Sequence, residues 1–246
     1  MDNTLLVGLN TQEMLRRRMD IVANNLANMS TAGFKSEVAL NELVIERPSQ
    51  ALDEPEDIRF TLVERMQRDM SAGTLTPTGG PMDFGMAEPN AFFAVRMGDQ
   101  TYYTRDGQFA LDDLSRLVTR EGAFVLDDAG NEMVFDPIGG PPTVSKAGVI
   151  RQGNIEIGRL GVYGFETPGA LEKAGGNFWT PGDQVPEAAE LPEVQQGVVE
   201  QSNVNAVFEI TRMIEISRAY TSASRLVKDA DELRKTAISK LGSAQS

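Results

Sequence analysis

Both ends of this 246-residue chain carry apolar residues at the alternating three- and four-residue spacing of a packed helix. Near the N-terminus these residues are Leu15, Met19, Val22, Leu26 and Met29. Near the C-terminus they are Met213, Ile216, Tyr220, Ala223 and Val227. A single amphipathic helix gains little stability in water, because its apolar face stays exposed. The two terminal segments are therefore predicted to pair as a coiled-coil-like domain.

The C-terminal segment has more apolar residues than one packed stripe needs. It contains no proline between Gly197 and Leu241, and no further glycine before Gly242. A helix there could exceed about 30 residues, or about 45 Å. Four additional apolar residues widen its face: Ile210, Ile214, Leu226 and Leu233. We predict that this second face packs against neighbouring subunits.

The middle of the chain has the composition of a β-rich body, with short β-prone runs separated by Gly and Pro. The runs predicted as strands are 91–95, 101–105, 108–111, 116–119, 123–126 and 159–165. Turns are predicted at Asp106-Gly107, Glu121-Gly122 and Ala129-Gly130-Asn131. The predicted fold class is α+β, with paired N- and C-terminal α-helices and a central all-β, hairpin-rich domain.

The predicted domain boundaries follow these changes in composition. Residues 1–36 are assigned to the N-terminal helix of an inner domain, 37–73 to an extended arm or linker, 74–193 to the central β-domain, and 194–246 to the C-terminal helix of the inner domain. Within these, the proline-containing stretches 47–57 and 181–193 are predicted as connections. The β-body is expected to stay folded without residues 1–35 or 205–246.

The formal net charge of −13 is concentrated in the middle of the chain, which contains 12 basic and 26 acidic residues. The terminal segments 1–37 and 196–246 are close to neutral. An acidic body argues against nucleic-acid binding and suits a well-solvated domain. Near-neutral ends suit segments that pack against other protein. The basic triplet at 16–18 lies off the apolar stripe and is interpreted as a solvated face.

The sequence offers no recognisable catalytic or metal-binding set. Cys and His are absent, so disulfides, thiol nucleophiles and imidazole chemistry are excluded. The acidic stretch 127–132 lacks the alternating ligands of a calcium loop, and hairpin-turn chemistry explains it better. The Gly-rich stretches 79–81 and 139–142 do not open a helix after a strand, so the sequence does not support a phosphate cradle. We expect no enzyme activity, cofactor or metal.

No apolar run approaches the roughly 20 residues needed to span a bilayer, so no membrane insertion is expected. The first ten residues contain an acid where a secretory signal has basic residues, and no small-residue cleavage site follows. A cleaved signal peptide is therefore not expected, while export by another route stays open.

The stretch VANNLANMSTAGFKSE, residues 22–37, places three asparagines near the end of the first predicted helix. Asparagine is a poor helix former. A helix continuing to Thr31 would put Gly33 in a left-handed conformation, with Phe34 touching Met29, as in a Schellman ending. The amides are either solvated at a frayed helix end, or they fix the register of a neighbour. The residues alone leave both interpretations open.

Residues 24–35, NNLANMSTAGFK, resemble the N-terminal signature of the flagellar rod and hook family. The signature is Asn-Asn-(Leu or Ile)-Ala-Asn, then a Thr, then Gly-Phe-Lys. The residues that match it, apart from the Thr, are Asn24, Asn25, Leu26, Ala27, Asn28, Gly33, Phe34 and Lys35. The resemblance implies that these residues form an assembly motif.

Three further stretches extend the resemblance over essentially the whole chain. Residues 78–86 and 103–126 are similar to the family's β-body segments. Residues 194–220 resemble its C-terminal signature, in which Ser202, Asn203, Val204 and Asn205 open the C-terminal helix. The departures lie in the β-body. At Gly79-Gly80-Pro81 a Gly replaces the usual Asn, residues 87–93 replace the usual glycine-containing turn, and Ser115 stands where Gly is usual.

The resemblance implies a structural role in the rod, the drive shaft that crosses the bacterial periplasm. Family members are exported without signal cleavage by the flagellar type III apparatus, and their terminal helices form the inner tube. The implied partners are copies of this chain, neighbouring proximal and distal rod subunits, and the export apparatus. The chain is too short to resemble the hook protein. Its N-terminal sequence and residues 200–205 and 213–220 resemble the proximal rod members more than the distal ones, which are the alternative. A cell-wall-binding module is a weaker alternative.

Overall fold

The computed structural model describes residues 2–46, 58–190 and 192–243, so the predicted connection at 47–57 lies outside the described residues. Internal contacts divide the chain into two units. The helical unit comprises Met1–Ala27, Glu37–Gln67 and Asn205–Ser246. The β unit comprises Asn28–Ser36 and Arg68–Val204. Each unit therefore draws on segments that are far apart in the sequence.

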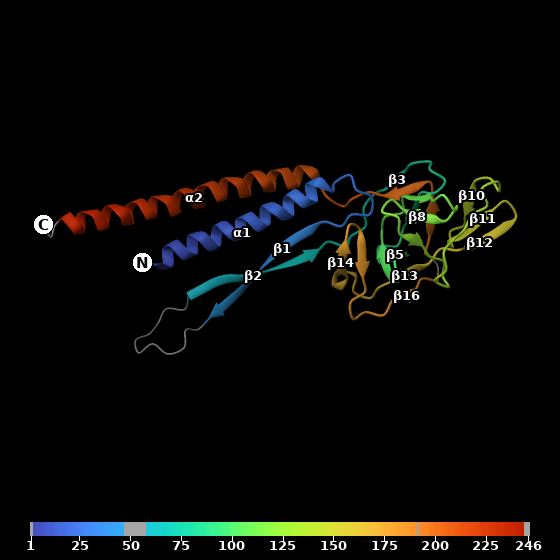
Figure 1. Cartoon of the computed structure of the whole chain (residues 1–246), viewed down its shortest axis with the longest axis horizontal. Helices are drawn as coiled ribbons and strands as arrows, with labels where there is room; N and C mark the ends of the chain where they lie inside the picture. The colour runs from blue at the N-terminus through green and yellow to red at the C-terminus, as the bar shows by residue number, and fades with distance from the viewer. Residues whose placement is uncertain (1, 47–57, 191, 244–246) are drawn as a thin grey trace. The chain divides into compact units, whose positions relative to one another are not determined.

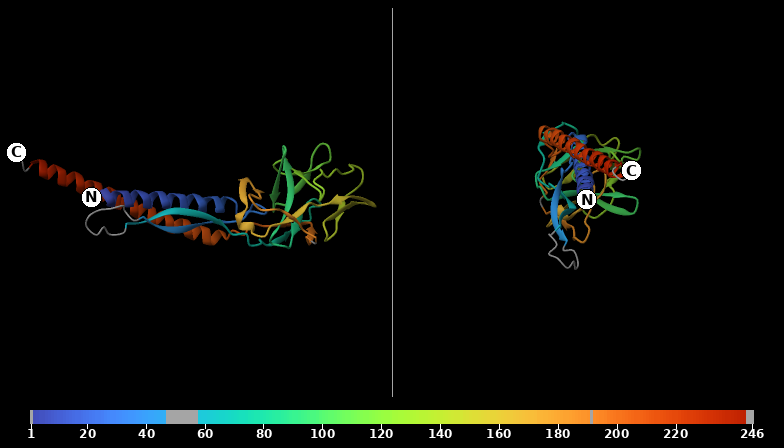
Figure 2. Two further views of the ribbon diagram at one scale, coloured as in Figure 1. Left: turned by 90° about the horizontal axis from the view of Figure 1, so that it is seen from below. Right: turned by 90° about the vertical axis from the view of Figure 1, so that its left-hand side faces the viewer.

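Two long helices form the main part of the helical unit. Helix α1 (Asp2–Ala27) and helix α2 (Ala206–Ser243) lie side by side and run in opposite directions (Figure 1 and Figure 2). Strands β1 (Glu37–Glu46) and β2 (Ile58–Arg68) pair as a two-stranded sheet. The structure thus confirms an N-terminal helix and a long C-terminal helix.

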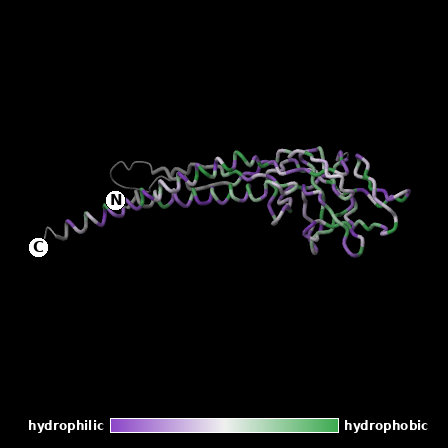
Figure 3. Tube along the Cα trace, turned by 90° about the horizontal axis from the view of Figure 1, so that it is seen from above, coloured by the Kyte–Doolittle hydropathy of each residue, from purple (hydrophilic) through white to green (hydrophobic). Residues whose placement is uncertain are grey.

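The contact face of the two helices follows the predicted apolar spacing. Leu15 and Val22 are buried on α1. The half-buried members of the predicted stripe are Met19, Leu26, Met213, Ile216, Tyr220, Ala223 and Val227. Figure 3 shows apolar and polar residues alternating along both helices, as expected when only one face of each is covered.

The predicted end of the N-terminal helix is wrong, because α1 ends at Ala27 rather than near Thr31. Met29 lies beyond this end and is 45% exposed, so it is outside the packed stripe. Gly33 does have a left-handed backbone, with φ of +67°. Its N–H donates to the carbonyl oxygen of Glu200 at 2.8 Å instead of returning to the helix, so the ending is not a Schellman motif.

The β unit is built from short antiparallel strands. Their bounds are β3 Leu75–Pro77, β4 Phe84–Met86, β5 Ala91–Met97, β6 Gln100–Thr104, β7 Phe109–Leu111, β8 Leu117–Thr119, β9 Phe124–Val125, β10 Pro142–Val144, β11 Val149–Gln152, β12 Ile155–Arg159, β13 Val162–Gly164, β14 Glu172–Gly175, β15 Phe178–Thr180, β16 Glu187–Ala188, β17 Val194–Gln196 and β18 Val198–Glu200. A short 3₁₀ helix, η1, spans Pro168–Ala170.

The largest sheet of the unit has nine strands. Its main path runs in the order β14-β15-β6-β5-β9-β8-β7, while β13 joins β5 to β16. Strands β10, β11 and β12 form a separate three-stranded sheet. The central all-β body predicted from the sequence is therefore present, and all but one of its six predicted runs contain a strand near the predicted bounds. The run 159–165 differs in that it contains the last residue of β12 and, after a break, the whole of β13.

Strand β5 lies at the centre of the core. Phe93 and Val95 belong to one buried cluster, whereas Phe92 and Ala94 belong to a second cluster. Successive side chains of a strand point to opposite faces, so both faces of β5 are covered. This explains why residues 91–95 are continuously apolar rather than alternating.

Two turn details connect the sequence to the observed backbone. Asp127 Oδ1 accepts hydrogen bonds from the backbone N–H groups of Ala129 at 2.9 Å and Asn131 at 2.7 Å, so the stretch 127–132 is a hairpin turn, as predicted. Ser115, which stands where the family usually has Gly, has a left-handed φ of 60°. That conformation explains why glycine is usual there.

The assignment of residues 194–246 entirely to the C-terminal helix is wrong at its start. Residues Val194–Gln196 form β17 against β4, and Val198–Glu200 form β18 against β3. Val194 and Val199 are buried in the β unit, and Gly197 joins the two strands with φ of +72°. The β-branched valines favour the strand, and the helix starts only after Asn205.

We predict that replacing Gly8 will disturb helix packing. A Cβ atom at Gly8 would lie 2.5 Å from Cγ2 of Val227, so Gly8→Leu should lower the free energy of unfolding of the helical unit by about 1–3 kcal/mol. Thermal unfolding followed by the helical circular dichroism signal measures this. The same change at exposed Asn10 is the control, and Gly8→Leu with Val227→Ala should recover part of the loss. Equal stability of both leucine variants would contradict the prediction.

Candidate functional site

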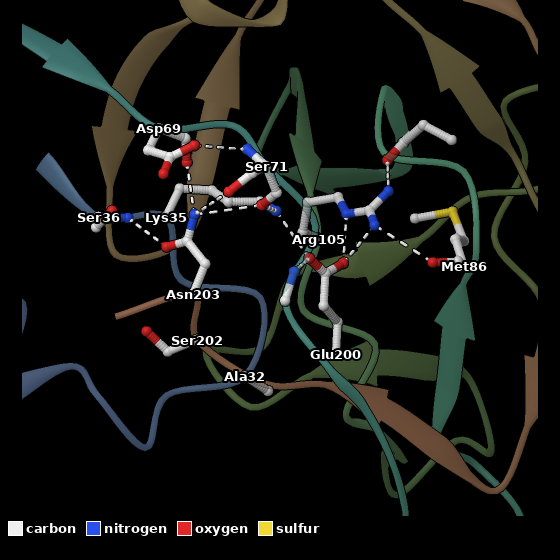
Figure 4. A network of polar contacts seen from close by, with 12 residues as sticks. Ala32, Lys35, Ser36, Asp69, Ser71, Met86, Arg105, Glu200, Ser202 and Asn203 are labelled. Carbon is white, nitrogen blue, oxygen red and sulfur yellow. Dashed lines mark hydrogen bonds and ion pairs between the residues drawn. The ribbon is translucent and has the colours of Figure 1, made fainter. Parts of the chain in front are cut away.

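The β unit encloses three charged side chains that are almost completely buried. Lys35, Arg105 and Glu200 are each at most 2% exposed (Figure 4). Lys35 ends the N-terminal signature, Arg105 follows β6, and Glu200 ends β18. Lys35 lies 165 positions from Glu200 in the sequence, and Arg105 lies 95 positions from it. The fold brings the three residues together.

The carboxylate of Glu200 is the centre of this charged cluster. Its Oε1 atom accepts hydrogen bonds from Lys35 Nζ at 2.7 Å and from the backbone N–H of Gly73 at 2.8 Å. Its Oε2 atom accepts from Arg105 Nε at 2.7 Å and also pairs with Nη2 of the same guanidinium. One carboxylate therefore serves two cations. Such charge-assisted bonds in a dry interior are strong and geometrically specific.

The two cations also use backbone carbonyl groups. Lys35 Nζ donates to the carbonyl oxygen of Ser71 at 2.6 Å. Arg105 donates to the carbonyl oxygens of Glu88, Ala91 and Met86, of which the last is 3.3 Å away. These bonds satisfy most of the donors of both side chains. A buried charge is tolerated only when it is paired and hydrogen-bonded in this way.

Burial lowers the pKa of both cationic side chains from their usual values. For Lys35 the loss of hydration is the largest effect on the pKa, and the neighbouring Glu200 carboxylate opposes it. The same balance lowers the pKa of Arg105. The carboxylate therefore has to be present for two adjacent cations to share this space.

Asn203, from the C-terminal signature, joins the same segments beside the charged cluster. Its Oδ1 atom accepts from the backbone N–H of Ser36 at 2.8 Å, and its Nδ2 atom donates to the carbonyl oxygens of Asp69 at 2.8 Å and Ser71 at 3.2 Å (Figure 4). Its own N–H reaches the carbonyl oxygen of Phe34. One amide thus fastens residues 34–36 to residues 69–71.

The Gly-Phe pair of the N-terminal signature is packed against the body. A Cβ atom at Gly33 would lie 2.5 Å from the backbone of Arg105 and Asp106, so only glycine fits this close approach. Phe34 is buried, and Lys173 Nζ lies 5.2 Å from its ring centroid. Asn177 Nδ2 also donates to the carbonyl oxygen of Ala32 at 2.8 Å. Residues 28–36 are therefore an integral part of the β unit.

This arrangement changes the expectation that the β-body folds without residues 1–35. Deleting them would remove Gly33, Phe34 and Lys35, and would leave Arg105 and Glu200 buried without their third charge. Residues 1–27, by contrast, belong to the helical unit. The boundary of what the β unit needs lies between Ala27 and Asn28 rather than after residue 35.

The asparagine run has partners within the chain. The amide of Asn25, which is buried, donates to the carbonyl oxygen of Glu37 at 2.8 Å and accepts from the N–H of Glu37 at 2.9 Å. Asn24 Nδ2 donates to the Glu37 carboxylate at 3.3 Å. Asn28 Oδ1 accepts from the Thr31 hydroxyl at 3.2 Å and closes the turn after α1. Solvated amides at a frayed end do not describe Asn25, which fixes the start of β1.

The remaining predicted residues have simpler positions. Leu26 is half-buried, and Ala27 is the exposed last residue of α1. The Asn205 side chain caps α2 by accepting from the N–H groups of Val207 and Phe208 at 3.2 and 3.3 Å. Ser202 Oγ accepts from the N–H of Val204 at 3.3 Å, which shapes the turn before the cap.

Arg105, Glu200 and Asn177 were not predicted as functional residues from the sequence. Arg105 and Glu200 do lie within stretches that resemble the family, but a charged residue in a Gly-rich turn or a three-residue strand is usually solvated. The only local signal is that Lys35, Arg105 and Glu200 each follow a short apolar or β-prone run. Their partnership is set by tertiary structure.

Two other kinds of feature, a metal-binding cluster and a membrane-spanning helix, are not found among the described residues. In residues 2–46, 58–190 and 192–243 no cluster of three acidic side chains is placed to hold a metal ion. Within the same ranges no helix has both the length and the apolar character required to cross a membrane. The charges of the buried cluster are paired with one another, and these pairs join segments that are distant in the sequence.

Comparison with known proteins agrees with this structural role. Models of three flagellar families match the chain: "Flagella basal body rod protein" over residues 5–35, "Flagellar hook protein FlgE/F/G D1 domain" over 88–157, and "Flagellar basal body rod FlgEFG protein C-terminal" over 195–240. The chain is 39% identical to the flagellar basal-body rod protein FlgF of Caulobacter vibrioides, over 98% of this chain and 99% of that protein. The chain belongs to the flagellar basal-body rod family.

Two other relatives refine the comparison. FlgF of Mesorhizobium japonicum is 32% identical over 99% of each chain. FlgG of Buchnera aphidicola from Schizaphis graminum is 30% identical over 92% of this chain and 94% of that protein. The similarity is therefore to FlgF-type rod proteins, and the distal-rod alternative is not favoured. This rod protein is a structural component of the flagellar basal body.

Removing the central carboxylate should unfold the β unit of this rod protein readily. Glu200→Gln leaves two buried cations without a counter-charge, and we expect a loss of about 3–5 kcal/mol in the free energy of unfolding. Denaturant unfolding followed by the fluorescence of the single Trp, at position 179, measures it. The control is Glu156→Gln in the exposed pair with Arg151, which should cost less than about 0.5 kcal/mol. Similar losses for both variants would contradict the role of the cluster.

The neighbouring Asp106 should make the β unit less stable as the pH rises. Burial raises the pKa of its carboxyl from 3.8 to about 6, although the N–H of Gln108 partly opposes the shift. The folded protein then holds this proton more tightly than the unfolded chain, and the resulting stability is lost as the pH passes from about 4 through about 6. Relative to Asp106→Asn, the wild type should lose about 2 kcal/mol between pH 4 and pH 7. Parallel unfolding curves for the two proteins across this range would rule out the shift.

Proposed function

We propose that this chain is a proximal rod subunit that assembles with copies of itself and with neighbouring rod proteins into the axial drive shaft. The single observation that best supports this is the full-length similarity to FlgF-type proteins, with 39%, 32% and 30% identity over nearly the whole chain. The assembled shaft crosses the periplasm and transmits torque from the motor to the hook. The subunit works through its interfaces and carries out no catalysis.

In this proposal α1 and α2 pair as a coiled-coil-like inner domain. The antiparallel packing of the helices and the spacing of their half-buried residues support it. Large apolar residues remain exposed on α2 after this pairing: Val207, Phe208, Ile210, Ile214, Leu226 and Leu233. Exposed apolar residues of this number on one helix suit contacts with further subunits.

The subunit is proposed to leave the cytoplasm unfolded through the flagellar type III apparatus, without cleavage of a signal peptide. The β unit is suited to closing after export, because it needs residues 28–36 together with β18 near the other end of the chain. A chain that threads through a narrow channel cannot close that unit until both segments have passed. Nothing in the described residues favours the cell-wall-binding alternative over this role.

Two matched deletions test the proposal. Deletion of residues 2–27 removes α1 but keeps every residue of the β unit, so a cooperative unfolding transition of that unit should persist. The same variant should be missing from purified basal bodies and should not restore swimming to a strain that lacks the gene. Deletion of residues 2–35 should in addition lose the unfolding transition, because Gly33 and Lys35 are gone. Normal swimming with residues 2–27 deleted would refute a role for α1 in rod assembly.

A further inference from the structure

The helical unit contains a cavity of about 290 Å³ that is lined by α1, α2 and the start of β1. Charged residues from all three elements line it: Arg18, Glu37, Glu209, Arg212 and Glu215. Val22 and Ile216 lie beneath these charges. Three acidic and two basic side chains give the lining an excess of negative charge.

Glu209 is the unusual member of this lining. Its side chain is only 6% exposed, and its Oε1 atom accepts from Arg212 Nη1 at 3.0 Å. Its Oε2 atom is buried and has no hydrogen-bond partner within the described chain. A buried carboxylate oxygen without a donor is costly, and native structures rarely leave one unsatisfied. Glu209 is one of the residues that line the cavity, so a donor that enters it from outside the chain would meet this carboxylate.

We propose that this cavity receives the guanidinium of Arg17 from a second copy of the chain. The inference rests on the proposed self-assembly and identifies one of its contacts. A guanidinium carries five N–H donors and a permanent positive charge. It would supply Glu209 Oε2 with its missing donor and offset the negative excess of the lining. An arginine binds carboxylates with a fixed geometry, so the contact would also set the register between subunits.

Arg17 is the arginine of α1 that faces furthest from the packed stripe. At about 100° per residue it lies about 200° around the helix from buried Leu15. Its side chain is 64% exposed and pairs with exposed Glu13 at 3.2 Å. An exposed pair of this kind contributes little and exchanges partners easily. Each copy therefore presents an exposed arginine on the side of α1 away from the packed stripe, together with a cavity lined by Glu209.

An exposed aromatic residue precedes Glu209, a lining residue of the cavity, on α2. Phe208 is 66% exposed and lies one turn before Arg212 on the same side of α2. Its ring suits both the methylene groups and the charged head of an incoming arginine. Because the arginine and the cavity are different surfaces, the contact is head-to-tail. Contacts of this type build rings or open filaments, which suits an axial structure.

Cross-linking between two marked copies tests the contact. The natural chain has no cysteine, so each introduced thiol is unique. One copy carries Asp20→Cys, one turn after Arg17, and the other carries Ala219→Cys, one turn after Glu215, at positions that are both exposed. The copies carry different tags, are expressed together, and are treated in purified basal bodies with a short bis-maleimide. A product bearing both tags reports contact between two subunits.

The expected pattern separates the proposed contact from general assembly. Glu209→Gln in the Ala219→Cys copy, or Arg17→Gln in the Asp20→Cys copy, should each lower the doubly tagged product about tenfold. The matched controls Asp229→Asn and Arg16→Gln, which change exposed charges outside the lining of the cavity, should keep it within about twofold. Helical circular dichroism of each full-length variant checks that the helices are retained.

Two results overturn the inference in different ways. If the subunits are present in basal bodies and the product is unchanged by Glu209→Gln or by Arg17→Gln, the cavity does not hold that arginine, while the proposed rod function stands. If both unsubstituted copies are absent from basal bodies, the proposed function itself fails, and the contact fails with it.

Discussion

The β unit depends on one buried carboxylate. Glu200 holds Lys35 and Arg105 at the same time, and each of the three side chains comes from a different part of the chain. An apolar core of similar volume could be as stable, but it would accept several arrangements of the same segments. Two cations bound to one carboxylate allow only one arrangement of these segments. Specific closure of distant segments is therefore the property that this cluster adds to the hydrophobic core.

The elements with a clear local period were predictable from the sequence. Both helices follow their apolar spacing, and residues 91–95 form a strand because both faces of β5 are buried. Strands β17 and β18 were missed, because three residues are too few to show a period and no proline separates them from the helix. Gly33 was correctly expected to have a positive φ, yet its reason is close approach to the backbone of Arg105 rather than the end of a helix.

The charged cluster could not have been predicted from spacing or composition. Lys35 and Glu200 are 165 residues apart, and each looks locally like an ordinary surface charge. Asn25 is a similar case, because its hydrogen bonds to the backbone of Glu37 depend on the chain turning back after α1. Local sequence determines which backbone a segment favours. Which buried polar group meets which partner is decided by the tertiary fold, where an unpaired group is too costly to survive.

The two units use different physical means for different requirements. The β unit satisfies its buried charges internally, so its most specific bonds are made once and within one chain. The helical unit buries Leu15 and Val22, yet large apolar side chains of α2 stay exposed. Within its described residues, the buried Oε2 atom of Glu209 has no hydrogen-bond partner. A subunit that has to be rigid by itself and also needs neighbours requires both properties. The exposed apolar residues of α2 leave that helix a surface for neighbours, whereas the charged cluster of the β unit is closed by its own bonds.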